Sequence, residues 1–216
     1  DVKINNALMV IGLILLTTGI HGLLNLLQIP SYPLLIPGYG ALIAALTIRL
    51  RNTLFPLQVL TILVLIYAVM LSTTFIGFIG YPLYRGLFNQ LEEIRDFARE
   101  LDFTSLTILI FLNNYAIALS SIAPIIGPFI VTMGSVNAAL LIGVNIAIQP
   151  LYIMIYVYPH TLPELLGYAV FISLSSRLTR IKPWLFLLIF LTGTLILLMA
   201  AFIESYLIFS TQRLTR

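Results

Sequence analysis

The stretch WLFLLIFLTGTLILLMAAFIESYLIF, residues 184–209, decides the class of fold. It is apolar along its whole length except for a few small polar side chains and one glutamate, Glu204. A helix crosses the hydrocarbon core of a membrane with about 20 residues, so this stretch is long enough to cross it with some tilt. The sequence therefore predicts that residues 184–209 form a transmembrane helix.

The composition extends this prediction to the rest of the chain. Of the 216 residues, 60% are hydrophobic and 9% are charged, and the mean hydropathy is +1.07. Soluble domains carry about 25% charged residues. We therefore expect an all-α, polytopic integral membrane protein, in which residues 1–216 form a single transmembrane bundle of about six or seven hydrophobic helices.

Six further apolar runs supply the other predicted membrane helices. They cover about residues 4–27, 34–48, 56–81, 104–123, 136–158 and 162–175. The first run is too long for the core of a signal peptide and is expected to remain as a span. The run 162–175 has only about 14 residues, which predicts either a short span or a re-entrant helix.

Prolines set the predicted helix boundaries in the second half of the chain. The motif APIIGP at 123–128 is predicted to separate two spans, and Pro150 to kink the second of them. Pro159 is predicted to end that helix. Thr161 and Glu164 would then form a capping box for the next helix, with Pro163 in its first turn.

Residues 85–102, RGLFNQLEEIRDFARELD, differ from the rest of the chain. Apolar side chains recur there at steps of three and four residues, and charged side chains fill the other face. This pattern is typical of an amphipathic helix that lies at the membrane interface or on a partner protein. An ordinary surface helix between two spans is the alternative.

The arginine and lysine positions give a prediction of topology, because these residues favour the cytoplasmic side. Arg49 and Arg51 inside place the N-terminus inside and the amphipathic helix outside. If 162–175 is a full span, the cluster at 177–182 is inside and the basic C-terminus is outside. If 162–175 is re-entrant, these two clusters exchange sides, and we favour the first arrangement.

Ionisable and amide side chains within the predicted spans are the candidates for function, because a charge at the membrane centre costs about 2.5–3.5 kcal/mol. The candidates are Asn113, Asn114, Asn145, Gln149, His160, Glu164 and Glu204. His160 and Glu164 are expected either to serve the predicted helix start or to act as a functional pair. Glu204 is expected either to face a cavity, His160 or an asparagine, or to reach toward the nearer membrane face.

Two patterns place the amide residues on helix faces. A stripe of small residues predicts a seam for close helix packing; its members are Asn113, Ala116, Ser120, Ala123 and Gly127. A polar arc of about 140° predicts a hydrogen-bonded bundle interior or a hydrated cavity. Its members are Asn137, Asn145, Gln149, Tyr156 and His160.

Motifs for catalysis and metal binding are missing from the sequence. There is no HExxH motif, and the chain has only two histidines and no cysteine. The prediction is therefore that the chain is not an enzyme and has no metal or other cofactor. Its net charge of +3, spread over many loops, predicts no nucleic-acid partner.

Three segments resemble the stage II sporulation protein M family. They are FLNNYAIALSSIAPIIGP at 111–128, YPHTLPELLGYAV at 158–170 and LLMAAFIESYL at 197–207. The resemblance implies that Asn113 or Asn114, His160, Glu164 and Glu204 occupy family positions. Thr161, where the family usually has glycine, departs from its pattern. In spore formers the family resembles a membrane anchor for enzymes that remodel the cell wall, and most members have no assigned activity.

Two functional hypotheses follow. The first is a scaffold in the cell membrane that holds other membrane or extracytoplasmic proteins through the helix 85–102 and the polar face of the bundle. Its other expected partners are membrane lipids and, as an alternative, further copies of itself. The second is a transporter or channel for a proton, ion or small solute, lined by His160, Glu164, Glu204 and the amide residues. The depth of Glu164 in the membrane separates the two hypotheses. If Glu164 caps a helix at the surface, the transport path loses its central residue.

Overall fold

The computed structural model describes the backbone of residues 2–148 and 150–214, and the side chains of these residues outside 2–8, 87–95, 99, 150–158 and 211–214. Within the described chain every regular element is helical, and no strand occurs. The long α-helices are α1 (Val2–Leu26), α2 (Leu35–Arg49), α3 (Phe55–Ile79), α4 (Tyr81–Glu100), α5 (Phe103–Ser120), α6 (Ile126–Ile148), α7 (Pro150–Ser175) and α8 (Pro183–Leu214). The predicted all-α bundle is confirmed.

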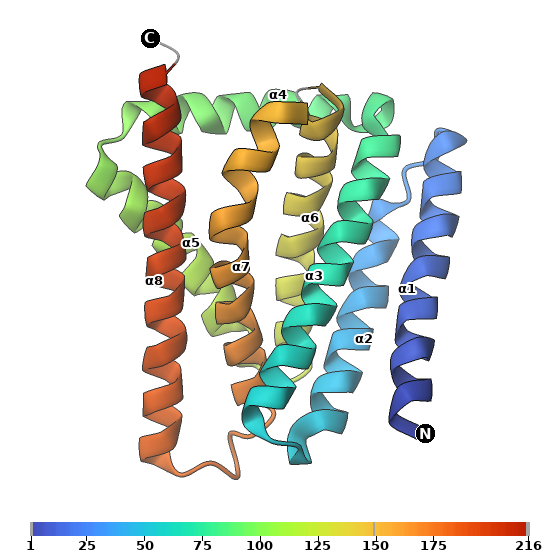
Figure 1. The fold of residues 1–216 in the computed structure, drawn as a ribbon, viewed down its shortest axis with the longest axis vertical. Coiled ribbons are helices and arrows are strands. Elements are labelled where there is room, and N and C mark those ends of the chain that lie inside the picture. Colours follow the sequence, from blue (N-terminus) through green and yellow to red (C-terminus); the bar gives the residue numbers. More distant parts are fainter. Residues whose placement is uncertain (1, 149, 215–216) are drawn as a thin grey trace.

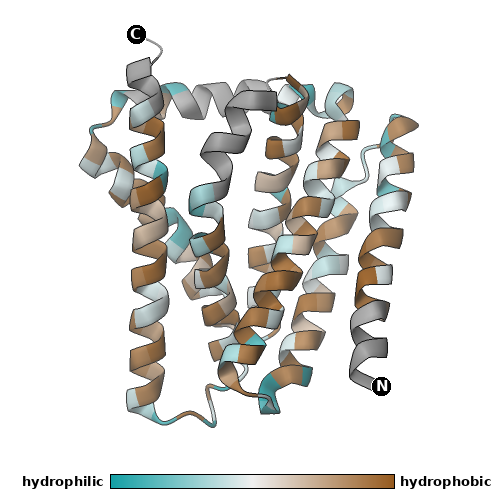
Figure 2. Ribbon diagram, viewed as in Figure 1, coloured by the Kyte–Doolittle hydropathy of each residue, from teal (hydrophilic) through white to brown (hydrophobic). Residues whose placement is uncertain are grey.

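The bundle has the dimensions and the surface of a multi-pass membrane protein. Helices α1, α3, α5, α6 and α8 are each long and apolar enough to cross a membrane, and so is α2 together with the short 3-10 turns at its two ends, Tyr32–Leu34 and Leu50–Asn52. Hydrophobic residues follow the long helices in Figure 2, and hydrophilic ones gather at the turns and ends. Large apolar side chains such as Leu60 and Leu195, exposed by 55% and 64%, point outward where lipid would surround the bundle.

Helix α4 differs from the others in direction. It lies across one end of the bundle, at the end where α3 finishes and α5 begins (Figure 1). This is the predicted amphipathic helix 85–102, and its orientation is the one expected for a helix in the membrane interface. Asp102 ends the loop after it and caps α5, with its carboxylate accepting from the backbone N–H groups of Thr104 and Ser105.

The prolines of α7 do not divide it, which corrects the predicted boundaries. Helix α6 begins at Ile126 and ends at Ile148, and α7 then runs without interruption through Pro159 and Pro163 to Ser175. Pro150 stands at the first position of α7, where its missing N–H is not needed. Neighbouring helices support a proline-containing helix inside a membrane, so Pro159 does not end it. Residues 162–175 are therefore neither a separate short helix nor re-entrant.

The centre of the bundle is α3 packed against α6. Ile62, Ile66 and Val69 of α3 are completely buried. Further along, Gly77 of α3 and Gly143 of α6 let the two backbones touch: an added Cβ on Gly77 would meet the Leu140 carbonyl, and one on Gly143 the Thr74 carbonyl. Small residues at helix crossings allow this close approach in membrane proteins.

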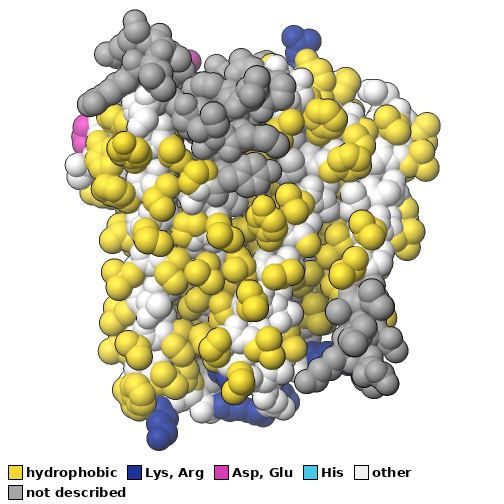
Figure 3. All heavy atoms as spheres, in the orientation of Figure 1, with side chains coloured by type: hydrophobic (Ala, Val, Ile, Leu, Met, Phe, Trp, Pro, Cys, Tyr) yellow, Lys and Arg dark blue, Asp and Glu magenta, His cyan; other side chains and the backbone are white. Residues whose placement is uncertain are grey.

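The basic turns gather at the end of the bundle opposite α4. The α2–α3 turn with Arg49 and Arg51 and the α7–α8 turn with Arg177 both lie at that end, together with the N-terminus (Figures 1 and 3). Helix α8 finishes at the other end of the bundle, where α4 lies. This arrangement of the basic turns is the one predicted for a full span at 162–175.

An arginine clamp joins these two basic turns. Arg177 donates from Nε to Gln58 Oε1 at 2.9 Å and from its guanidinium to the Thr53 carbonyl. Arg180 donates to Asn52 Oδ1 at 2.8 Å. The amide of Gln58, which is fully buried, donates in turn to the Thr47 carbonyl. The clamp fixes the lower ends of α2, α3 and α7 relative to one another.

Candidate functional site

The site begins with the register between α7 and α8, which run antiparallel. Their backbones approach closely because Gly167 faces Leu197 and Gly193 faces Phe171, with no room for a Cβ at either glycine. His160 lies two turns before Gly167 on α7, and Glu204 lies two turns after Leu197 on α8. Because the two helices are antiparallel, His160 and Glu204 lie opposite each other. The glycine contacts therefore determine which polar side chains meet.

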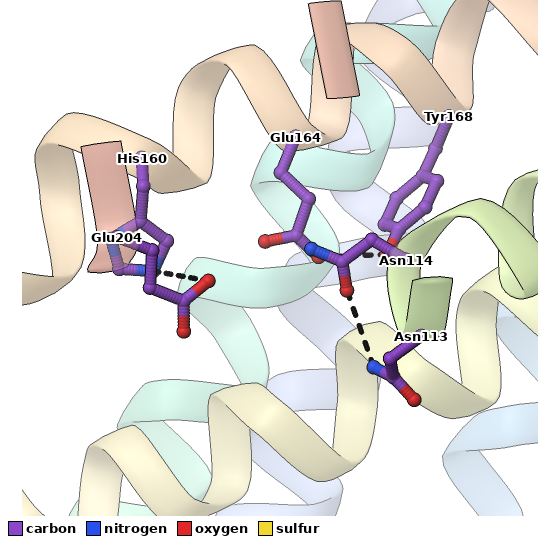
Figure 4. A network of polar contacts seen from close by, with 6 residues as sticks. All are labelled: Asn113, Asn114, His160, Glu164, Tyr168 and Glu204. Atoms are coloured by element: carbon purple, nitrogen blue, oxygen red, sulfur yellow. Dashed lines mark hydrogen bonds and ion pairs between the residues drawn. The ribbon is translucent and has the colours of Figure 1, made fainter. Parts of the chain in front are cut away.

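His160, Glu164 and Glu204 form one cluster, which we name the His160 cluster. His160 and Glu164 lie one turn apart on the same face of α7 because the helix continues through Pro163. One ligand atom from each of the three residues lies within 4.8 Å of the others. His160 Nε2 is 4.0 Å from Glu204 Oε2 (Figure 4).

Outer partners orient the Glu164 carboxylate. The Tyr168 hydroxyl, one turn further along α7, donates to Glu164 Oε1 at 2.8 Å. From α5, the buried Asn114 side chain points toward Glu164, and its own Oδ1 accepts from Asn113 Nδ2 at 3.3 Å (Figure 4). Three helices, α5, α7 and α8, thus contribute polar groups to one place.

Within the described side chains, no Lys or Arg balances the charges of the cluster. Among the described residues, His160 is the one cationic partner of either carboxylate, and no described Lys or Arg pairs with Glu164 or Glu204. The side chains of His160 and Glu204 are exposed by 15% and 28%, so the cluster is partly open. Two carboxylates and one imidazole in this setting need protons or a cation to reach neutrality.

The depth of the cluster follows from its place on α8. Glu204 lies about 11 Å from the midpoint of residues 184–209 at about 1.5 Å per residue, toward the end where α4 lies. At this depth Glu204 faces His160, as their 4.0 Å contact shows, and this is one of the two outcomes expected for Glu204. The predicted capping box is wrong: Thr161 and Glu164 lie inside α7, so Glu164 does not serve a helix start.

The remaining predicted site residues stand outside the cluster. Asn145 donates to the Leu141 carbonyl of its own helix. Gln149 lies outside the described residues. The predicted polar arc is wrong as a single face, because α6 ends at Ile148 and His160 belongs to the next helix. Asn137, another member of the arc, is exposed on α6.

The small-residue stripe is not a seam within this chain. Asn113, Ala116, Ser120 and Ala123 are all exposed, and only Gly127 is buried. An added Cβ at Gly127 would meet the backbone of Ser121, so this glycine serves the tight α5–α6 turn. The stripe therefore faces away from the other helices of the chain.

Two features of the structure were missed by the sequence reasoning. Tyr168 was not singled out, although its place four residues after Glu164 on an unbroken helix would have indicated the contact. Asn25 of α1 was not among the candidate residues, yet it joins three helices, α1, α3 and α4. It accepts from the Tyr84 hydroxyl at 2.8 Å and donates to the Ile76 carbonyl at 3.2 Å. The role of Asn25 is structural.

No family model, no curated protein and no solved structure matches this chain. The resemblance to the stage II sporulation protein M family stays a prediction from the three quoted segments.

Proposed function

We propose that this chain is a transporter or channel of the cell membrane that binds a cation, either a proton or a metal ion, at the His160 cluster. One observation carries the proposal: an imidazole and two carboxylates from two helices converge within 4.8 Å inside the bundle. A single charge in a span costs about 2.5–3.5 kcal/mol, so three ionisable groups at one place lower the stability of the bundle. Binding of a cation offsets that cost and gives a reason for these residues to be there.

The surroundings of the cluster support binding in preference to a purely structural role. A structural pair would be closed and balanced, but the described chain supplies no Lys or Arg to Glu164 or Glu204. Glu204 and His160 are also partly exposed, which leaves a route for a small cation. We propose no catalytic role.

The test is flux into liposomes that contain the purified protein. A pH gradient and a Mn²⁺ gradient are imposed in separate experiments and followed with trapped dyes. Wild-type protein should carry one of the two cations faster than protein-free liposomes. Glu204→Gln should reduce that flux to the protein-free level, whereas Glu100→Gln, which neutralises an exposed acid on α4, should leave it unchanged. Wild-type flux at the protein-free level for both cations would refute the proposal.

A scaffold role, as the resemblance to the sporulation family implies, is the second candidate. It is favoured by α4, which lies across one end of the bundle (Figure 1). An apolar hollow lies where α4 meets α5. The hollow is lined by Phe97, Leu101, Ser105, Ile108, Leu109 and Leu112. Crosslinking in native membranes should recover a stoichiometric partner that Phe97→Asp releases and Phe97→Leu retains. Recovery of the chain alone would count against this role.

A further inference from the structure

We infer that His160, Glu164 and Glu204 together bind one divalent transition-metal ion such as Zn²⁺ or Mn²⁺. The inference rests on the proposed function and deepens it, because it names the cation of the His160 cluster as a metal ion in place of a proton.

The donor types and their spacing fit such an ion. Imidazole nitrogen and carboxylate oxygen bind Zn²⁺ at about 2.0–2.2 Å, which places donors about 3.3 Å apart in a tetrahedral site. In the cluster His160 Nε2 and Glu204 Oε2 are 4.0 Å apart, and all three ligand atoms lie within 4.8 Å. Rotation of the two glutamate side chains by about 1 Å at their ends closes this difference.

Among metal ions, charge balance favours a divalent ion over a monovalent one. Two carboxylates, a neutral imidazole and one M²⁺ ion form a set with no net charge, which is the least costly state in a membrane interior. A monovalent ion would leave one negative charge uncompensated. Ca²⁺ prefers six to eight oxygen ligands and Mg²⁺ keeps most of its water, so the histidine favours a transition metal.

Outer contacts hold the ligands in place, as at known metal sites. Tyr168 donates to Glu164 Oε1 at 2.8 Å, which leaves the other carboxylate oxygen of Glu164 for the ion. Asn114, only 6% exposed, points at the same carboxylate from α5 (Figure 4). The contacts of Gly167 with Leu197 and of Gly193 with Phe171 hold α7 against α8. These contacts fix the register of the two helices, so that His160 and Glu164 of α7 lie next to Glu204 of α8.

Three protein ligands leave at least one coordination position for water or for an incoming ligand. Structural zinc sites are closed by four protein ligands, whereas three ligands and an open position are typical of sites that exchange or react. The exposed fractions of His160 and Glu204, 15% and 28%, provide access to that position. The site therefore suits an ion that enters and leaves.

The experiment is direct metal binding to the full chain, purified in detergent, with the affinity tag removed and bound metal stripped by a chelator. Equilibrium dialysis measures the stoichiometry for Zn²⁺, and the visible absorption of Co²⁺ reports ligand type and geometry. We expect one ion per chain and Co²⁺ bands that indicate nitrogen and oxygen ligands. His160→Gln, Glu164→Gln and Glu204→Gln should each abolish the bands.

Two further variants keep the result interpretable. Tyr168→Phe retains all three ligands and should weaken Co²⁺ binding by about 10- to 100-fold, the usual effect of losing an outer partner. His21→Gln removes the other histidine, which is buried in α1, and should leave binding unchanged. A ligand variant that fails to elute as a monodisperse peak is replaced by the matching Asn variant, which also carries no carboxylate or imidazole.

The outcomes separate this inference from the proposed function. Binding of less than one ion per chain, or binding that survives all three ligand variants, identifies an adventitious ion only and overturns the inference. Proton flux that requires Glu204 without metal binding overturns the inference and leaves transport standing. Stoichiometric binding without any flux supports the metal site and refutes transport.

Discussion

His160 of α7 and Glu204 of α8 face each other at 4.0 Å across a pair of helices that glycines bring into contact. Neither residue is placed by its own segment of sequence. Their distance depends on Gly167 and Gly193, which allow Leu197 and Phe171 to fit between the helices. The geometry of the cluster is therefore expected to respond to substitutions that touch none of its three members.

Gly193→Ala should disturb the His160 cluster from a distance. An added Cβ would lie 2.6 Å from Cε2 of Phe171, which is completely buried and has little room to move. Overpacking of this kind costs about 1–3 kcal/mol and should push α8 away from α7. We expect weaker Co²⁺ binding and lower flux with all three ligands present. Gly19→Ala, where a Cβ meets nothing within 4 Å, is the control; equal effects of both substitutions would contradict the prediction.

Gly143→Ala should destabilise the whole bundle. The added Cβ would meet the backbone of α3 at Thr74 and Phe78, and backbone atoms cannot move aside as the end of a side chain can. We expect a loss of at least about 3 kcal/mol, the upper range for overpacking, seen as a lower melting temperature in detergent. Gly134→Ala on the same helix meets only Ile117 Cδ1 at 3.6 Å and should be tolerated. Similar melting temperatures for the two variants would refute the close α3–α6 crossing.

Arg177→Ala should weaken the arginine clamp at the basic end of the bundle. The substitution removes the donor to Gln58 Oε1 and to the Thr53 carbonyl, and hydrogen bonds to charged groups contribute about 1.5–3 kcal/mol. Arg180→Ala removes one hydrogen bond to Asn52 at an exposed position and should cost less than about 1 kcal/mol. Denaturation in mixed detergent measures both variants. A double-mutant cycle of Arg177 with Gln58 that shows no coupling would contradict the clamp.

The cap of α5 should weaken in acid. The side-chain hydroxyl of Ser105, followed by the backbone N–H groups of Ser105 and Thr104, holds the pKa of Asp102 below its ordinary value of 3.8. The folded state therefore binds this proton less tightly than the unfolded state. The stabilisation is complete above the ordinary pKa and is lost as the pH falls through the lower, folded value.

Hydrogen exchange of the first amides of α5 measures this pH dependence. The protection of the Thr104 and Ser105 amides, expressed relative to the intrinsic exchange rate at each pH, should fall below a pH of about 4 in the wild-type protein. Asp102→Asn keeps a good capping side chain and should abolish the pH dependence. Asp102→Ala should exchange quickly at every pH. A wild-type profile that is flat in acid would show that the carboxylate is not the cap.

Single cysteines should report the topology, since the natural chain contains none. Arg51→Cys and Lys182→Cys lie in turns at the basic end of the bundle, and Glu100→Cys lies at the end of α4. A membrane-impermeant thiol reagent added to intact cells should label Glu100→Cys, whereas the other two should react only after the cells are opened, because basic turns favour the cytoplasm. Labelling of Arg51→Cys and Lys182→Cys from opposite sides would contradict a full crossing by α7.

The sequence by itself determined the class of the fold and most of its helices. Long apolar runs leave no other stable option in a membrane, because every backbone N–H and C=O group must bond within its own helix there. The amphipathic pattern of 85–102 likewise predicted a helix that does not cross. These properties depend on local composition and period, so the sequence of a single chain was enough.

Tertiary structure decided the rest. By local rules Pro159 predicts the end of one helix and Pro163 the start of the next, but packing of α7 against α3, α6 and α8 supports one unbroken helix. Only that continuity places His160 and Glu164 on one face, and only the glycine contacts with α8 bring Glu204 to them. The distance between side chains on different helices depends on how those helices pack, and no local pattern in the sequence specifies it.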